Sequence, residues 1–207
     1  EELLGLMKQA GCLFVFIGFE SVNPRSLQAM KKEQTLAEMK AAVKLIRRHG
    51  IRVHGMFVYG FDEDDWVTVR KTVRFAKRFG LTSTQFLILT PLPGSEFYRK
   101  VKAEGRLLFK DWGLYDAHHV VFWPAKLSLR TLQKAQMFSH KKFYSLLQSG
   151  KRIFRLQLFE VVLAHYARNL NKMWKKKNRA FLKVLELLTS SKNSHIRIDY
   201  KQDAGLE

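Results

Sequence analysis

The first part of the chain alternates short apolar runs with longer amphipathic stretches. The runs cover residues 13–19, 53–59 and 85–89, and each is rich in Val, Ile, Leu or Phe. Successive apolar positions in a short run are typical of a strand buried on both faces of a parallel sheet. The pattern therefore predicts three such strands.

Helix signals fill the intervals between these runs. Asn23 followed by Pro24 marks a helix start, since Asn caps and Pro suits the first turn. Thr35 and Glu38 have the spacing of a capping box. A further helix is predicted over 64–79, with acids at its start and bases at its end. Two strand–helix–strand crossovers predict an α/β fold, either an open sheet or part of a barrel.

The pattern changes after the third run. Residues 90–95 form a turn with two prolines, and residues 106–125 are irregular and rich in aromatic side chains. Residues 128–188 are predicted to be helical with one break at Ser149–Gly150, and the polar end from residue 190 is expected to fray. We therefore predict two regions: an α/β region over 1–125 and an all-helical appendage over 126–207.

Composition narrows the class of protein. The 207 residues are 46% hydrophobic, which is typical of a folded chain, and no uncharged apolar run approaches the roughly 18 residues of a membrane span. The single cysteine, Cys12, excludes an internal disulfide or an all-cysteine metal site and favours the cytoplasm. The start at Glu1 and Glu2 has no signal peptide, and suggests a piece of a longer chain.

The net charge of +19 is unevenly distributed. Residues 1–125 contain 19 basic and 13 acidic residues, whereas residues 126–207 contain 18 basic and 5 acidic residues. The run Lys172–Arg179 places five bases around Trp174. Such a helix either binds anionic lipid or nucleic acid, or is the solvated side of a bundle packed on the α/β region.

Candidate chemistry lies where the strands end, because parallel α/β folds bind ligands there. Glu20 and Ser21 follow the first run; they either bind an amine or a ribose, or cap the next helix. The acids at 62–65 either hold a hard cation or, as we favour, begin a helix. For the pair at 118–119 we favour a structural role over metal binding, since adjacent histidines on an extended segment point apart.

An ordered set of motifs now becomes recognisable. They are Gly18-Phe19-Glu20-Ser21, Asn23-Pro24, Met30-Lys31-Lys32, Gly55-Met56-Phe57-Val58-Tyr59-Gly60-Phe61-Asp62 and Leu87-Ile88-Leu89-Thr90-Pro91-Leu92-Pro93-Gly94-Ser95. In this order and spacing, residues 1–135 resemble the second half of a radical S-adenosylmethionine domain. The branch resembled most is the one that carries an amino-terminal cobalamin-binding domain.

The resemblance implies the second half of a partial (β/α)6 TIM-like barrel, with strands four to six and their outer helices. It also implies a [4Fe–4S] cluster held by a Cys-x3-Cys-x2-Cys motif, which these 207 residues lack. The cluster, and any cobalamin, would then be bound by an upstream half of the same protein. We expect the chain to be inactive by itself.

The resemblance also assigns binding roles for S-adenosylmethionine. Glu20 matches the residue that meets the ribose, with Ser21 as its neighbour, and Lys32 matches a base that pairs with the methionyl carboxylate. Lys31 takes that role if the register shifts by one. The remaining matches line the adenine or adenosine: Met56, Val58, Gly60, Leu89, Thr90 and Pro91. Asp62 stands where many relatives have Pro, which leaves this loop less defined. No catalytic or metal-binding residue is assigned.

The implied activity is radical chemistry through reductive cleavage of S-adenosylmethionine, with methyl transfer or rearrangement as the reactions common in this branch. Nothing in these residues identifies the substrate, although a hydrophobic one fits some relatives. The alternative is a basic α/β module that attaches to nucleic acid or anionic membrane through residues 151–188. In the membrane case the cytoplasmic protein would be peripheral to the bilayer.

Overall fold

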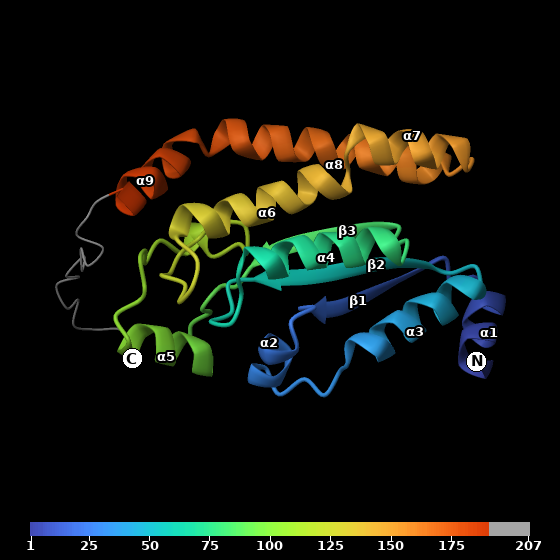
Figure 1. Cartoon of the computed structure of the whole chain (residues 1–207), viewed down its shortest axis with the longest axis horizontal. Helices are drawn as coiled ribbons and strands as arrows, with labels where there is room; N and C mark the ends of the chain where they lie inside the picture. Colours follow the sequence, from blue (N-terminus) through green and yellow to red (C-terminus); the bar gives the residue numbers. More distant parts are fainter. Residues whose placement is uncertain (191–207) are drawn as a thin grey trace.

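The computed structural model describes residues 1–190, which build a single parallel sheet with helices around it (Figure 1). A first helix, α1 (Glu2–Gln9), precedes the sheet. The strands are β1 (Phe14–Glu20), β2 (Arg52–Tyr59) and β3 (Ser83–Ile88), in the order β1-β2-β3. All three predicted strands are confirmed, with bounds that differ by one or two residues. The frayed end expected after Ser190 lies outside the described residues.

The crossover helices begin at the predicted caps. They are α2 (Pro24–Ala29) and α3 (Leu36–Arg48) between β1 and β2, and α4 (Trp66–Arg78) between β2 and β3. The side chain of Asn23 accepts a hydrogen bond from the Arg25 amide, and Thr35 and Glu38 form the complete capping box. These local signals explain why the crossover helices begin where they do.

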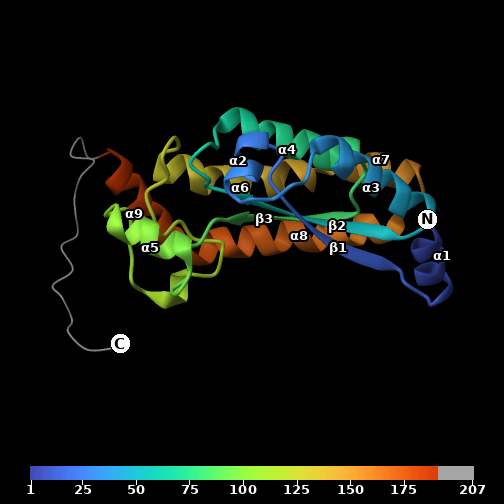
Figure 2. The ribbon, with the colours of Figure 1, turned by 90° about the horizontal axis from the view of Figure 1, so that it is seen from below.

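One face of the sheet carries the core. Phe57 of β2 stacks between Phe19 of β1 and Phe86 of β3, with ring centroids 5.5 and 5.7 Å apart. All three side chains are fully buried. Figure 2 shows α3 and α4 on this side of the sheet and α8 on the other. Burial of large aromatic rings is a main source of the sheet's stability.

The other face, which we call the open face, is only partly covered. Along β2, buried residues alternate with half-buried ones, and Phe16 on β1 is 69% exposed. The expectation that both faces are buried is therefore wrong for the described residues. The first turn of α8 contacts this face, where Phe159 lies 6.3 Å from Phe14 and Glu160 pairs with Arg52 at 3.5 Å.

The irregular region after β3 lies beyond the carboxyl ends of the strands. It contains α5 (Glu96–Ala103), the short 3-10 turn η1 (Trp112–Leu114) and a bridge between Leu107 and Phe122. The Ile88 amide donates to the Ala117 carbonyl at 2.8 Å, which ties this segment to β3. The predicted two-proline turn and aromatic irregular segment are confirmed.

The remaining helices correct one prediction. They are α6 (Leu129–Phe143), α7 (Leu146–Phe154), α8 (Leu158–Lys177) and α9 (Arg179–Ser190). The predicted break at Ser149–Gly150 is wrong, because both residues lie inside α7. The chain instead turns at Tyr144–Ser145, at 155–157, where Leu156 has a φ of 55°, and at Asn178.

Helix α6 shares the core of the sheet. Leu129 and Leu132 are fully buried in the same cluster as Phe57. The Tyr144 hydroxyl accepts from the Thr84 amide at 2.8 Å and donates to the Thr84 carbonyl at 2.9 Å. It thereby provides hydrogen-bond partners for the backbone groups of Thr84 on the outer edge of β3. The charge-based division at residue 125 stays a prediction. None of the helices in residues 1–190 has the length and apolar character that a bilayer span requires.

Candidate functional site

The carboxyl ends of the three strands meet at one end of the sheet, beside α2 and α5 (Figure 1). Glu20 ends β1, Gly60 follows β2, and Leu89 follows β3. The Leu89 amide donates to the Tyr59 carbonyl at 2.8 Å, so the last two of these ends are joined directly. The topology thus brings the predicted strand-end residues together.

Glu20 occupies a strained position in a bulge of β1. Gly18 pairs with Met56, but Glu20 pairs with Phe57, so β1 gains one residue relative to β2 at this point. Glu20 has a φ of 62°, a left-handed conformation that costs a non-glycine residue free energy. Its carboxylate lies where a Cβ on Gly18 would project. Since Gly18 and Met56 are paired, this carboxylate lies on the open face.

Lys32 reaches the same place from the turn after α2. Its ammonium lies 3.6 Å from the Glu20 carboxylate, and it also donates to the Gly18 carbonyl. Both side chains keep about a third of their surface exposed, 34% for Lys32 and 32% for Glu20. The neighbouring Lys31 is exposed, and within residues 1–190 its side chain forms no hydrogen bond or ion pair with Glu20 or Gly18. The structure therefore brings Lys32, and not Lys31, to Glu20.

Of the other predicted residues, some are half-buried and others are buried. Met56 and Val58 lie half-buried on the open face beside Gly18. Ser21 and Pro91 are buried, and the Ser21 hydroxyl accepts from the Asn23 amide at 3.0 Å. Ser21 therefore shapes the start of α2, the capping role considered for it. Leu89 and Thr90 are half-buried, with the Thr90 hydroxyl donating to the Ile88 carbonyl at 3.1 Å.

Gly60 is fixed by close packing and by Asp64. Its φ of 116° is accessible to glycine, and a Cβ there would lie 3.2 Å from Leu132. The buried Asp64 carboxylate accepts from the amides of Gly60 (3.0 Å) and Phe61 (3.2 Å) and from the Ser26 hydroxyl (2.9 Å). Burial raises the pKa of Asp64 to about 6, although these hydrogen bonds oppose the shift. Asp64 holds the end of β2 to α2.

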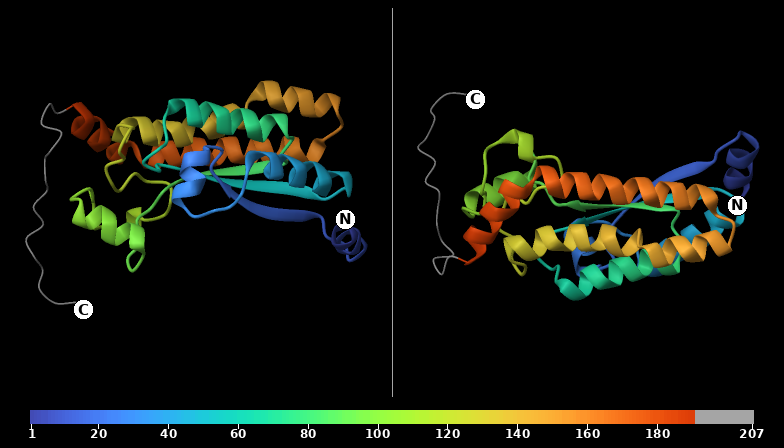
Figure 3. Two further views of the ribbon diagram at one scale, coloured as in Figure 1. Left: turned by 60° about the horizontal axis from the view of Figure 1, so that its bottom comes forward. Right: turned by 90° about the horizontal axis from the view of Figure 1, so that it is seen from above.

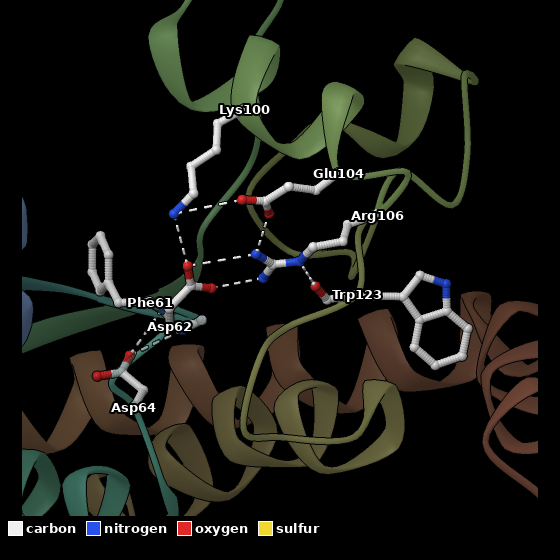
Figure 4. A network of polar contacts seen from close by, with 8 residues as sticks. Phe61, Asp62, Asp64, Lys100, Glu104, Arg106 and Trp123 are labelled. Atoms are coloured by element: carbon white, nitrogen blue, oxygen red, sulfur yellow. Dashed lines mark hydrogen bonds and ion pairs between the residues drawn. The ribbon is translucent and has the colours of Figure 1, made fainter. Parts of the chain in front are cut away.

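The neighbouring acids also have partners. Asp62 lies between Lys100 at 3.0 Å and Arg106, whose guanidinium approaches to 2.7 Å (Figure 4). Glu63 pairs with Lys126 at 2.7 Å, and Asp65 caps α4 by accepting from the Thr68 amide at 2.7 Å. The helix-start interpretation is confirmed for Asp65. These carboxylates are used by protein donors, so the structure gives no support to the cation interpretation.

Sequence reasoning missed the link between Asp62 and Arg106. Arg106 also donates to the Trp123 carbonyl at 2.7 Å and to Glu104 at 2.8 Å, which fastens α5 and the aromatic segment to the end of β2 (Figure 4). Although burial raises it, the pKa of Asp62 is held below its ordinary value by hydrogen bonds and attraction from Arg106 and Lys100. Forty-four residues separate the pair, so no local pattern could have revealed it.

The two histidines have structural contacts. His119 is 6% exposed; its Nδ1 lies 2.9 Å from Asp116 and its Nε2 lies 3.0 Å from Asn178. Its ring also contacts Phe181 of α9, with centroids 4.7 Å apart. His118 contacts the Gln136 amide at 3.1 Å. His119 thus joins the aromatic segment to the α8–α9 corner, which agrees with the favoured structural interpretation.

The residues present do not fit a metal cluster. Cys12 lies before β1, at the opposite end of the sheet from Glu20, and its thiol is 3.6 Å from the Phe14 carbonyl. Across residues 1–190, no three His, Cys, Asp or Glu side chains gather in a way that could hold a metal ion. The open face at the strand ends instead carries the Glu20 carboxylate and the Lys32 ammonium beside the apolar side chains of Met56 and Val58, a combination that suits an organic ligand.

The sequence is similar to a known protein family and to several known enzymes. Residues 1–76 match the model of the radical SAM superfamily. The chain is 35% identical over 127 residues to bacteriochlorophyllide d C-12(1)-methyltransferase of Chlorobaculum tepidum, which covers 61% of this chain and 27% of that protein.

Two further relatives carry other activities in their names. The chain is 25% identical over 144 residues to an anaerobic magnesium-protoporphyrin IX monomethyl ester cyclase of Cereibacter sphaeroides, covering 70% of this chain and 23% of that protein. It is 28% identical over 111 residues to hopanoid C-2 methylase of Rhodopseudomonas palustris, covering 53% and 21%. The chain spans about a quarter of the length of the curated relatives it matches.

Proposed function

We propose that the chain, whose residues 1–76 match the radical SAM superfamily, supplies part of the S-adenosylmethionine pocket of a radical SAM enzyme. The observation that carries this proposal is the pairing of Glu20 and Lys32 on the open face at the carboxyl ends of the strands. A carboxylate and an ammonium side by side, with apolar neighbours, complement a ligand that carries hydroxyls, a carboxylate and a flat base.

Each proposed role follows from the chemistry of the side chain. The Glu20 carboxylate would accept hydrogen bonds from the ribose hydroxyls. The Lys32 ammonium would pair with the methionyl carboxylate as a point charge. Met56 and Val58 would pack against the adenine. Gly60 and Ser21 would position the strand ends around these side chains. Leu89, Thr90 and Pro91 would line the adenosine from the segment after β3.

We assign the [4Fe–4S] cluster to residues outside this chain, because the single cysteine and the donor sets of the described residues do not fit it. Bound by those other residues, such a cluster would supply the electron for reductive cleavage of S-adenosylmethionine. We accordingly expect these 207 residues to bind ligand weakly and to show no turnover alone. We assign cobalamin, the cofactor of the branch that the sequence resembles, to residues outside the chain as well.

We infer that the reaction is methyl transfer to carbon or a related ring-forming step. This rests on the relatives, which are named as a methyltransferase, a cyclase and a methylase. The compounds in their names are large ring systems, and we propose a hydrophobic substrate of that kind. The free cysteine fits our placement of the protein in the cytoplasm.

Calorimetric titration of the intact radical SAM protein with S-adenosylmethionine tests the pocket. We expect Glu20→Ala and Lys32→Ala each to raise the Kd about tenfold, since each removes a hydrogen bond to a charged group. Lys31→Ala is the matched control, with the same charge loss at the adjacent residue. An unchanged Kd in both site variants, or an equal loss in the control, would contradict the proposal.

A further inference from the structure

The surface formed by α7 and its turn into α8 exposes many large apolar side chains. Phe154 is 92% exposed and Leu156 is 84% exposed. We call the full set the apolar tip: Leu146, Leu147, Ile153, Phe154, Leu156 and Leu158. It lies at the amino ends of the strands, at the opposite end of the sheet from Glu20 (Figure 1).

Hydrogen bonds to and from other residues of α7 fix the orientation of this helix, so that the apolar tip faces away from the sheet. Arg168 of α8 donates to the Ser149 hydroxyl at 2.8 Å and to the Tyr144 carbonyl at 3.0 Å. Arg152 donates to the Glu160 carbonyl at 3.2 Å and to the Thr82 carbonyl at 3.3 Å. Because these bonds orient α7 on the rest of the fold, the exposed apolar side chains form a fixed surface.

A strongly cationic hollow of about 390 Å³ lies beside the tip. Its basic lining residues are Lys8, Arg47, Arg52, Lys77, Lys151, Arg152 and Arg155. Glu160 is the single acidic residue among those that line it, and it pairs with Arg52 at 3.5 Å. Burial, together with repulsion from Lys142 and Lys151, lowers the pKa of Lys77. The hollow therefore has a large uncompensated positive charge.

β1 pairs on one side with β2 and has no partner strand on its other side among the described residues. In the left view of Figure 3, α7 lies at the top of the molecule and most of β1 lies toward the bottom. The start of β1 nevertheless reaches α8 beside the tip, where Phe14 lies 6.3 Å from Phe159, and Leu13 lines the cationic hollow.

We propose that α7 and the α7–α8 turn dock on an anionic phospholipid surface. The apolar tip enters the boundary between headgroups and acyl chains, and the cationic hollow receives lipid phosphate groups. Apolar side chains rimmed by Lys and Arg are the chemistry that such a surface selects. A second copy of this face would bring like charges together, and a nucleic acid would leave the tip in water.

This places membrane contact in a different part of the tail from the one that its basic run suggested. On α9, Leu185 is buried and Phe181 and Leu188 pack against the core, so the apolar face of that helix is covered within the protein. The bases near Lys172 have the exposed apolar side chains of Leu170 and Met173 beside them. The segment at 146–158 gathers six exposed apolar side chains next to the cationic hollow.

Flotation with vesicles of phosphatidylcholine, with and without phosphatidylglycerol, tests the proposal. We expect binding only to the anionic vesicles. Phe154→Ser with Leu156→Ser, and separately Lys151→Glu with Arg155→Glu, should each weaken binding about tenfold or more. The matched controls are Val162→Ser with Met173→Ser, and Lys172→Glu with Lys176→Glu, which make the same changes at exposed positions of α8. They should change binding less than about twofold.

Three results would overturn the proposal. The first is no binding to the anionic vesicles by the parent protein, and the second is an equal loss in the controls. The third is saturable binding of inorganic phosphate or duplex DNA by a protein that does not bind vesicles, with the same affinity in the parent and in the Phe154→Ser, Leu156→Ser variant. Melting midpoints within about 3 °C of the parent verify that the exposed substitutions leave the fold intact.

Discussion

The carboxylate of Glu20 folds back over Gly18 and fills the space that a side chain at position 18 would take. Lys32 then contacts both residues, the carboxylate by its charge and the Gly18 carbonyl by a hydrogen bond. The absence of a side chain at position 18 is thus what allows an acid and a base to lie together on the open face.

This relationship predicts the effect of Gly18→Ala. The new methyl group would displace the Glu20 carboxylate, which is the end of a flexible side chain, so the free energy of unfolding should change by less than about 1 kcal/mol. The Kd for S-adenosylmethionine in the intact protein should rise about as much as in Glu20→Ala. Urea denaturation and calorimetric titration measure the two quantities. Unchanged affinity in Gly18→Ala would show that the position of the carboxylate is unimportant.

The left-handed backbone at Glu20 predicts a difference between two variants that both lose the carboxylate. Glu20→Gly should be more stable than Glu20→Ala by about 1 kcal/mol, because glycine adopts a φ of 62° without the clash of a Cβ. Urea denaturation of the two variants measures this directly. Equal stability would mean that the bulge relaxes when the carboxylate is removed.

Asp64 should be essential for the end of β2. Asp64→Ala leaves the Gly60 and Phe61 amides without their acceptor, and we expect a loss of about 2–4 kcal/mol. Asp64→Asn keeps an acceptor of the same shape and should lose less. Chemical denaturation of both variants at one pH gives the comparison, and equal losses would contradict it.

The same residue predicts a pH dependence. Its folded-state pKa of about 6 lies above its ordinary value, so between about pH 4 and 6 the folded state binds more protons than the unfolded state. The stability of the parent relative to Asp64→Asn should therefore fall as the pH rises through this window. A constant difference from pH 4 to 7 would show that burial does not perturb this carboxyl.

His140 should have the opposite effect. Burial lowers its pKa to about 4, so the unfolded state binds more protons between about pH 4 and 6.5. The parent should lose roughly 2–3 kcal/mol relative to His140→Gln as the pH falls through that window. Because Asp64 is present in both proteins, its contribution cancels. Denaturation curves at pH 7, 6, 5 and 4.5 test the prediction, and parallel pH profiles would refute it.

Local patterns were sufficient for the strands and their crossover helices. The capping box at Thr35, the Asn23–Pro24 start and the apolar runs depend on neighbours a few residues apart, so the sequence predicted them correctly. The break at Ser149–Gly150 failed because a single glycine costs a helix only about 1 kcal/mol. Tertiary packing instead sets where the helix ends: α6 ends at Phe143, and the hydroxyl of the next residue, Tyr144, bonds to the edge of β3.

By itself the sequence determined the order of the three strands and their crossover helices, and therefore which residues follow each strand end. Only the tertiary structure decided which of those residues meet. It paired Lys32 with Glu20 and Asp62 with Arg106, packed the apolar face of α9 inward and left the tip of α7 exposed. Periodicity and caps are local properties of the chain. Partners across tens of residues depend on how the elements pack, because each apolar face is buried only if another element covers it.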